Sequence, residues 1–226
     1  MNTLILTTLA TALATALTAN VAVAQSVAET NGMLAASNRV TPPPVPANIQ
    51  VPEGSKAFLV GHGVGTQNYI CLPSAASASG VAYVLFTPEA TLFNDDSKEV
   101  ITHFFSPNPF ENNTNPALVA AGPIRATWQH SRDSSTVWAK VDQNPDGTNA
   151  SSTDPAFVKQ GAVAWLRLKV VGFENGPTGG DVLTKTTFIQ RLSTVGGVAP
   201  STGCISSTDV GNQAFVPYTA DYFFYK

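Results

Sequence analysis

The sequence predicts an all-β domain, built as an antiparallel β-sandwich or a partly closed β-barrel with long loops. From residue 56 onward, short runs of β-branched and aromatic residues alternate with clusters of Gly, Pro, Asn, Asp and Ser. This pattern is typical of strands separated by turns. No stretch of the region sustains an apolar period of 3.6 residues, so amphipathic helices are not expected.

Nine runs are expected to form strands, and their even spacing favours a sandwich or a barrel. Alternation is clearest in the seventh run, where Leu166 and Leu168 face one side and Arg167 faces the other. In chain order the nine runs are Lys56–Val60, Thr66–Leu72, Val81–Phe86, Glu99–Phe105, Ile124–His130, Thr136–Val141, Val163–Val171, Leu183–Leu192 and Phe215–Tyr225.

Three long connections interrupt these strands, at Ser106–Pro123, Asp142–Gln160 and Gly196–Asn212. Loops of this length in a compact domain usually carry function or lack fixed structure. The third connection contains Cys204, so a disulfide is expected to hold it in place.

Residues 1–24 predict a cleaved secretory signal peptide. An apolar stretch runs from Leu4 to Leu17, and Ala22-Val23-Ala24 offers the small-x-small cleavage pattern before Gln25. The apolar stretch is short of a membrane span, so a membrane anchor and a transit peptide are the weaker alternatives. We therefore expect a secreted protein, extracellular or in the cell wall.

Residues 25–50 are expected to form a Pro-rich N-terminal arm or a propeptide, ahead of a single β-domain at 51–226. The run Thr41–Pro46 contains four prolines, and each fixes φ and lacks an amide donor. This run is therefore expected to be extended, with polyproline character, as a stiff arm or a strand on the domain surface.

Composition narrows the partners of this domain. Charged residues make up 12% of the chain and the formal net charge is −3, so no basic stripe is available for nucleic acid. No second apolar run reaches membrane length, so no stable membrane anchor is expected. Carbohydrate or a small molecule is the expected partner.

The two cysteines, Cys71 and Cys204, are expected to form a disulfide, because an even pair in an oxidising compartment usually bridges. Two buried free thiols are the alternative. Two N-glycosylation sequons begin at Asn112 and Asn149, both in polar segments predicted as loops, which would make the chain a glycoprotein in a eukaryotic host.

The run Gly61-His62-Gly63-Val64-Gly65 resembles a phosphate-binding loop only superficially. A dinucleotide fingerprint requires a helix behind the glycines, whereas this chain continues into the strand-like Gln67–Cys71. A glycine-rich hairpin or bulge with an exposed His62 is expected instead.

A metal site is the sharper chemical hypothesis. His103 and His130 each fall on the apolar face of a predicted strand, and together with a Tyr or carboxylate they could hold copper or zinc. The alternative is two core histidines bonded to backbone carbonyls. Asp221 is a further candidate for acid–base catalysis, beside Glu89, Glu99 and Asp133.

Aromatic residues suggest a binding surface. Trp128 and other aromatic side chains could stack on sugar rings, although a tryptophan in a β-protein more often belongs to the core. Trp138 and Trp165 lie on faces opposite apolar neighbours, so one of them is expected to be exposed.

The C-terminal half carries a recognisable set of motifs: Ile189–Thr194, Gly196–Pro200, Gly203-Cys204 and Val216–Tyr225, with Gly65–Cys71, Pro88–Leu92, Thr102–Phe104 and Ala162–Leu166 upstream. Together they resemble the domain-of-unknown-function family 3455, and the separation of Gly122-Pro123 from Trp128 is similar to its fungal branch. The resemblance implies no established activity. Some members carry a malate dehydrogenase label, which the absence of a Rossmann pattern opposes.

The resemblance singles out polar or amphipathic residues inside strands. Such groups need partners when buried. A network joining Arg191 and Asp221 could fix strand register, or the residues could line a pocket. The set comprises Gln67, His103, Trp128, Gln190, Arg191, Asp221 and Tyr222.

Non-catalytic binding of a polysaccharide or small ligand is the function that these observations favour. Ligand contacts would fall on Gln67, Trp128, Gln190, Arg191 and Tyr222. A secreted metal-dependent or acid–base enzyme using His103 and His130 is the first alternative, and a cell-wall or host-interaction surface protein is the second.

Overall fold

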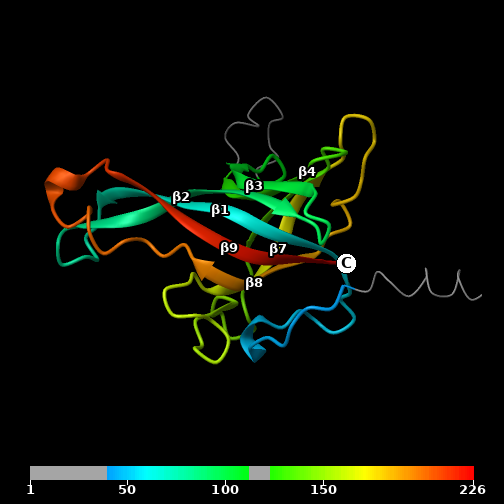
Figure 1. Cartoon of the computed structure of the whole chain (residues 1–226), viewed down its shortest axis with the longest axis horizontal. Helices are drawn as coiled ribbons and strands as arrows, with labels where there is room; N and C mark the ends of the chain where they lie inside the picture. Colours follow the sequence, from blue (N-terminus) through cyan, green and yellow to red (C-terminus); the bar gives the residue numbers. More distant parts are fainter. Residues whose placement is uncertain (1–39, 112–122) are drawn as a thin grey trace, which may run out of the picture. The chain divides into compact units, whose positions relative to one another are not determined.

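Eight antiparallel strands close into a β-barrel, and a short ninth strand lies beside it (Figure 1). The computed structural model describes residues 40–111 and 123–226, and Val40–Lys226 is a compact unit of its own. The predicted signal peptide at 1–24, residues 25–39 and the Asn112 sequon lie outside the described residues. The strands are β1 (Ala57–Pro73), β2 (Val81–Phe93), β3 (Glu99–Pro107), β4 (Ile124–His130), β5 (Thr136–Val141), β6 (Ser151–Ser152), β7 (Trp165–Glu174), β8 (Phe188–Gly196) and β9 (Gln213–Tyr225).

The barrel closes where β5 pairs with β7. The sheet runs β5-β4-β3-β2-β1-β9-β8-β7, and antiparallel pairs from Thr136↔Glu174 to Val141↔Leu168 join its two ends. The all-β class and the barrel alternative are thereby confirmed. Closure pairs the strands at the two ends of the sheet with each other, and β6 pairs with β7 beyond the β5 contact.

Strand boundaries differ from the prediction in several places: β2 continues past Phe86 to Phe93, β7 is shifted to Trp165–Glu174, and the short β6 was not predicted. The runs at 56–60 and 66–72 form one continuous strand, β1, and Gly61–Gly65 lies in its middle instead of forming a hairpin or bulge. The strand β8 begins at Phe188, after a turn at residues 182–185, and runs on to Gly196.

The glycines of β1 are explained by close contacts on its inner face. A Cβ on Gly63 would lie 3.0 Å from Cε2 of Tyr222, and one on Gly61 would lie 2.9 Å from the Leu92 side chain. At Gly65 it would overlap the Glu89 carbonyl oxygen. Neighbouring strands therefore approach β1 so closely that glycine is favoured at these positions, most strongly at Gly65.

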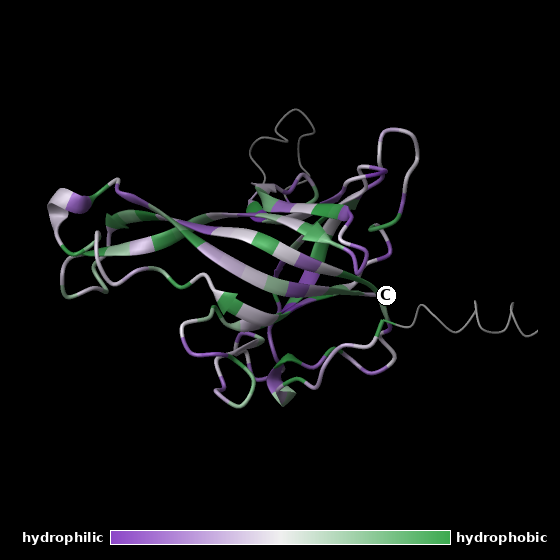
Figure 2. Cartoon of the chain, viewed as in Figure 1, coloured by the Kyte–Doolittle hydropathy of each residue, from purple (hydrophilic) through white to green (hydrophobic). Residues whose placement is uncertain are grey.

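One end of the barrel is filled by an apolar core. Leu92, Ile101, Val137, Ile189 and Phe224 are all fully buried there, together with Leu183 from the β7–β8 connection. Hydropathy alternates along the strands in Figure 2, as expected where alternate residues face the interior.

Trp138 and Trp165, which lie outside this core, are both buried, whereas one of them was expected to be exposed. Trp138 is 6% exposed, and its indole N–H donates to the Ser106 hydroxyl at 2.9 Å. Trp165 is also 6% exposed and packs edge-on against Phe157. The outer face of the barrel thus offers a second buried layer that the sequence pattern does not reveal.

That layer includes residues 40–50, the described part of the predicted N-terminal arm. They carry a single 3-10 turn, Ala47–Ile49, and no strand, so only an arm in contact with the domain surface is observed. Ile49 is fully buried against Leu192 and Phe223, and Gln190 Nε2 donates to the Ile49 carbonyl at 2.6 Å. Removal of this segment as a propeptide stays an untested alternative.

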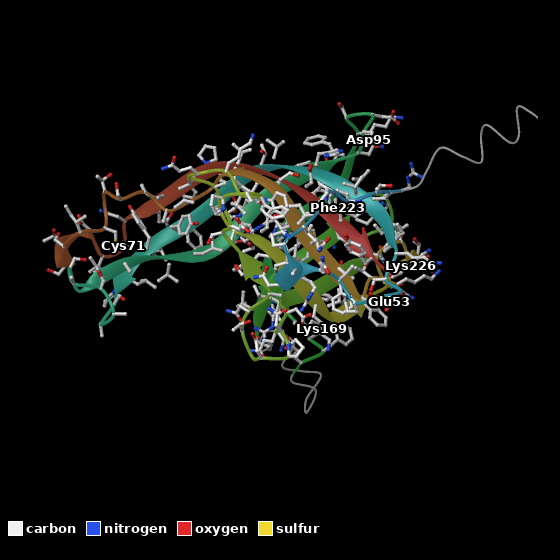
Figure 3. All side chains as sticks on the ribbon, turned by 90° about the horizontal axis from the view of Figure 1, so that it is seen from below. Glu53, Cys71, Asp95, Lys169, Phe223 and Lys226 are labelled. Atoms are coloured by element: carbon white, nitrogen blue, oxygen red, sulfur yellow. A yellow bond between two sulfur atoms is a disulfide. The ribbon has the colours of Figure 1, made fainter. Side chains whose placement is uncertain are left out.

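The predicted disulfide is present between Cys71 and Cys204. Beyond the barrel, the ends of β1, β2 and β9 continue together as a ribbon, and Cys71 lies near its far end (Figures 1 and 3). The bridge fastens the β8–β9 connection to this ribbon. Among the described residues, no helix has the length and hydropathy to cross a membrane.

Candidate functional site

The end of the barrel opposite the apolar core holds a cavity of about 410 Å³. Each of the eight barrel strands contributes at least one lining residue, so the cavity is an interior space of the barrel. Its volume falls within the usual range of small-molecule sites. The lining residues are Gln67, Tyr69, Leu85, Pro88, His103, Phe105, Ile124, Arg125, Ala126, Trp128, Ala139, Lys140, Val141, Val163, Ala164, Leu166, Leu168, Arg191 and Tyr222.

Exposure of the lining residues changes along the cavity. Ile124 is 54% exposed and the Lys140 side chain is 51% exposed, so these residues lie at its mouth. Trp128 and Tyr222 are each 1% exposed and lie at its inner end, against the apolar core. The cavity therefore runs from solvent into the barrel and ends at these two rings.

His103 contributes an uncharged imidazole to the inner wall. Its ring stacks on Trp128, with 4.2 Å between ring centroids, and its Nδ1–H donates to the Thr127 carbonyl at 2.8 Å. Burial is the main reason that the pKa of His103 falls from 6.5 to about 3. The ring is therefore neutral at physiological pH, with the lone pair on Nε2.

Arg191 supplies a cation to the same wall. Its Nη2 and Nε donate to the Ala164 carbonyl at 2.8 Å and 3.2 Å. In the sheet it pairs with Leu166 on β7 and Tyr222 on β9, which also line the cavity. Burial raises the pKa of Tyr222, and the guanidinium beside it opposes that rise.

Two further polar groups lie in the wall without a hydrogen-bond partner among the described residues, Gln67 Nε2 and Trp128 Nε1. Both residues are 1% exposed. Nearby, the hydroxyl groups of Tyr218 and Tyr222 are 3.0 Å apart. The inner wall is therefore polar as well as aromatic, and unpartnered buried groups are uncommon in folded proteins.

Two ion pairs with Glu111 lie at the mouth of the cavity. Arg125 Nε and Nη2 donate to the two carboxylate oxygens of Glu111 at 2.5 Å and 2.9 Å, and Lys140 Nζ lies 3.7 Å from the same carboxylate. The hydrogen bond from Arg125 lowers the pKa of Glu111 despite an opposing effect of burial. Two cations thus share one carboxylate at the entrance.

The structure brings together five of the residues singled out from the sequence: Gln67, His103, Trp128, Arg191 and Tyr222 all line the cavity. Gln190 does not, because neighbouring strand residues point to opposite faces. Its side chain lies on the outer face, where it contacts the Ile49 carbonyl and the Tyr225 hydroxyl.

Asp221 also lies away from the cavity, and the expected network with Arg191 is not formed. Its carboxylate contacts His62 Nδ1 at 2.7 Å, and His62 Nε2 contacts Asp95 at 2.9 Å. Arg191 pairs across the sheet with Tyr222, and Leu192 is the residue opposite Asp221. The two side chains therefore face opposite sides of the barrel wall.

His130 lies near the end of the barrel that the apolar core fills, where it contacts Asp133. Its Nδ1 lies 2.9 Å from Asp133 Oδ1, which also accepts from the Ser135 backbone and hydroxyl. Burial alone would raise the pKa of Asp133, but these bonds and one from Val182 N–H lower it to about 2. His103 and His130 thus have separate partners, and no group of three His, Cys, Asp or Glu in residues 40–111 and 123–226 is arranged to hold a metal.

Other residues lie outside the cavity or were not anticipated. The predicted glycosylation acceptor Asn149 is exposed in the β5–β6 connection. Sequence reasoning missed Arg125, Lys140 and Ala164 as parts of the cavity. Alternation puts Arg125 and Lys140 on the faces opposite Ala126 and Ala139, and they reach the cavity at its mouth, whose position depends on closure of the sheet.

Comparison with known proteins identifies the family but no activity. The model of a family described as "protein of unknown function (DUF3455)" matches residues 52–226. No curated protein and no solved structure gives a significant match.

Proposed function

The chain belongs to the DUF3455 family of proteins of unknown function, and we propose that its barrel binds a small apolar ligand without altering it chemically. The observation that carries this proposal is the 410 Å³ cavity, to which all eight barrel strands contribute. An apolar ligand inside the barrel would lose much of its contact with water, and removal of apolar surface from water is favourable by about 25 cal/mol per Å².

The shape of the site favours a small molecule over a polysaccharide. The inner end of the cavity is blocked by Trp128 and Tyr222, which pack on the buried core of the barrel. A polymer has no route through such a site, whereas a compact ligand can enter at Ile124 and Lys140. Trp128 is part of this wall, so its fluorescence is a natural reporter of occupancy.

The chemistry of the wall favours binding over catalysis. Of the three candidate catalytic residues, His103 lines the cavity, whereas Asp221 and His130 contact other groups elsewhere. A pKa of about 3 makes His103 a weak base at neutral pH. Its place between Trp128 and Tyr222 suits a neutral hydrogen-bond acceptor for a ligand.

We place this binding outside the cytoplasm, in the extracellular space or the cell wall. The Cys71–Cys204 disulfide supports that location, because disulfides persist in oxidising compartments. The predicted signal peptide at 1–24 supports it independently. Mass spectrometry of protein secreted by its host should find a chain that lacks residues 1–24, and an intact Met1 would contradict this location.

The binding proposal is tested with the neutral dye N-phenylnaphthylamine and two alanine variants. Ala126 lines the cavity, so Ala126→Phe should fill it and abolish dye binding. The matched control is Ala82→Phe, which enlarges an alanine of β2 that is not part of the cavity and should bind like wild type. Equal dye binding by Ala126→Phe, or none by wild type, would refute the proposal.

A further inference from the structure

We infer that the ligand is a small monocarboxylic acid with an apolar body, and that its carboxylate is bound by Arg191. This inference rests on the proposed function of the cavity and adds the chemical class of its ligand. The observation behind it is an imbalance of charge: the lining residues include three cations, Arg125, Lys140 and Arg191, and no carboxylate.

The three cations differ in whether a carboxylate already neutralises them. Arg125 and Lys140 share Glu111 at the mouth. Arg191 forms no ion pair with an acid in the described part of the chain; its hydrogen bonds go to uncharged groups, the Ala164 carbonyl and the Tyr222 hydroxyl. The sequence of 112–122 contains no Asp or Glu, so that segment offers no carboxylate either.

An unpaired guanidinium in an apolar wall is costly, because burial removes water that would otherwise solvate the charge. Arg191 is half-buried and lies among Val163, Leu166 and Tyr222. An entering carboxylate would restore the missing counter-charge. It would also make charge-assisted hydrogen bonds, which are stronger than neutral ones.

The donors of Arg191 leave room for such a contact. A guanidinium has five N–H groups, and its contacts with the Ala164 carbonyl engage one at Nε and one at Nη2. A further N–H contacts the Tyr222 hydroxyl, so two of the five N–H groups stay available for a ligand. The Ala164 carbonyl meanwhile holds the planar group in one orientation, which reduces the entropy lost on binding.

The guanidinium of Arg191 lies close enough to three lining residues to influence their pKa values. Its positive charge opposes the burial-driven rise in the pKa of Tyr69 and of Tyr222, and it adds to the burial-driven fall in the pKa of His103. All three residues line the cavity. The charge therefore acts on the interior, where a carboxylate would meet it.

The apolar residues that line the cavity indicate the chemistry of the rest of the ligand. Leu85, Phe105 and Leu168 line it together with other apolar side chains. One cation without a carboxylate partner, Arg191, in a mainly apolar lining suits one acid group on a hydrocarbon body. Lys140, exposed at the mouth beside Arg125 and Glu111, would attract such an anion over short range.

The test compares decanoate with decanol, which share a chain and differ in charge. Displacement of N-phenylnaphthylamine measures both affinities for the full chain. Wild type should bind decanoate about 10- to 100-fold more tightly than decanol, the range expected for a hydrogen-bonded charge contact. Arg191→Met should remove that preference while leaving decanol affinity unchanged.

Two further variants keep the test decisive. Lys169→Met removes an exposed cation of β7 that does not line the cavity, so its decanoate preference should equal that of wild type. Arg191→Lys keeps the charge but not the planar fork, and should retain part of the preference even if Arg191→Met folds poorly.

Each contrary result has a distinct meaning. Equal affinity of wild type for decanoate and decanol, or an Arg191→Met variant that keeps the preference, would overturn the acid inference and leave cavity binding intact. Dye binding without displacement by decanoate would overturn it in the same way. Absence of dye binding by wild type would instead refute the proposed function itself.

Discussion

The imidazole of His103 lies face to face with the indole of Trp128, with 4.2 Å between ring centroids and 9° between the ring planes. The two residues are register partners on β3 and β4, so the stack follows directly from strand pairing. It places an ionisable ring in an aromatic, water-excluded wall, and burial lowers the pKa of His103 to about 3.

This environment predicts that His103 destabilises the protein in mild acid. In the unfolded chain the ring gains a proton as pH falls below 6.5, but in the folded protein it does so only near pH 3. Stability from this group is therefore lost as pH decreases below 6.5, by about 1.4 kcal/mol per unit. Urea denaturation should show about 2 kcal/mol less stability at about pH 5 than at about pH 7 from this residue.

His103→Phe should be less sensitive to acid than wild type by the same amount, since phenylalanine does not titrate. Comparison of the two proteins cancels the carboxylates that they share. An identical loss of stability in both proteins would contradict the assignment of the acid sensitivity to His103.

His62 should have the opposite pH dependence. Hydrogen bonds with Asp95 and then Asp221 raise the pKa of His62 above 6.5. Its stabilising effect is therefore fully present below pH 6.5 and is lost as pH rises through the raised pKa. The side chain is 44% exposed, so the effect should be small and should weaken in salt.

Titration of the imidazole resonances by NMR measures this pKa directly. Asp221→Asn should return it towards 6.5, and Asp95→Asn should do so as well. A wild-type His62 that titrates at or below 6.5 would show that the two carboxylates do not hold the proton.

Loss of the Cys71–Cys204 bridge should lower stability substantially. The two residues are 133 positions apart in the sequence, and the chain-entropy model gives about 5 kcal/mol for a loop of that size. The double variant Cys71→Ser, Cys204→Ser should melt at a markedly lower temperature. Reductant should lower the melting temperature of wild type and leave that of the variant unchanged.

The glycines of β1 should tolerate alanine to different degrees. Gly65→Ala would drive its new methyl group into the Glu89 carbonyl, which is backbone and is fixed by strand pairing. Gly63→Ala instead meets the edge of the Tyr222 ring at 3.0 Å. We expect a loss of about 3 kcal/mol at Gly65 and about 1 kcal/mol at Gly63, measured by denaturant unfolding. Equal losses would argue against backbone crowding at Gly65.

The sequence predicted the strand content because β-branched and aromatic runs with a period of two are a local signal. It predicted strands β4 and β5 with the bounds observed. It divided β1 in two, because Gly61, Gly63 and Gly65 resemble turn residues when their neighbours are unknown. Glycine is favoured at these positions because Leu92, Tyr222 and Glu89, which belong to other strands, lie close to the β1 backbone.

The candidate site residues also divide into those that the sequence located correctly and those that it did not. The family resemblance indicated Gln67, Arg191 and Tyr222, which are polar or amphipathic residues inside strand patterns. The same resemblance also indicated Gln190 and Asp221, which lie on the outer face. Alternation separates neighbours such as Gln190 and Arg191, but it does not say which of the two faces becomes the interior.

The amino-acid sequence by itself determined the β class, the paired cysteines and the two faces of each strand, because each depends on composition or on spacing within a few residues. Only the tertiary structure decided that β5 joins β7, that the inner faces enclose a cavity, and that Arg191 is without a carboxylate while Asp221 binds His62. The physical reason is that closure and charge pairing join residues far apart in the chain, whose positions depend on the twist and register of all eight strands.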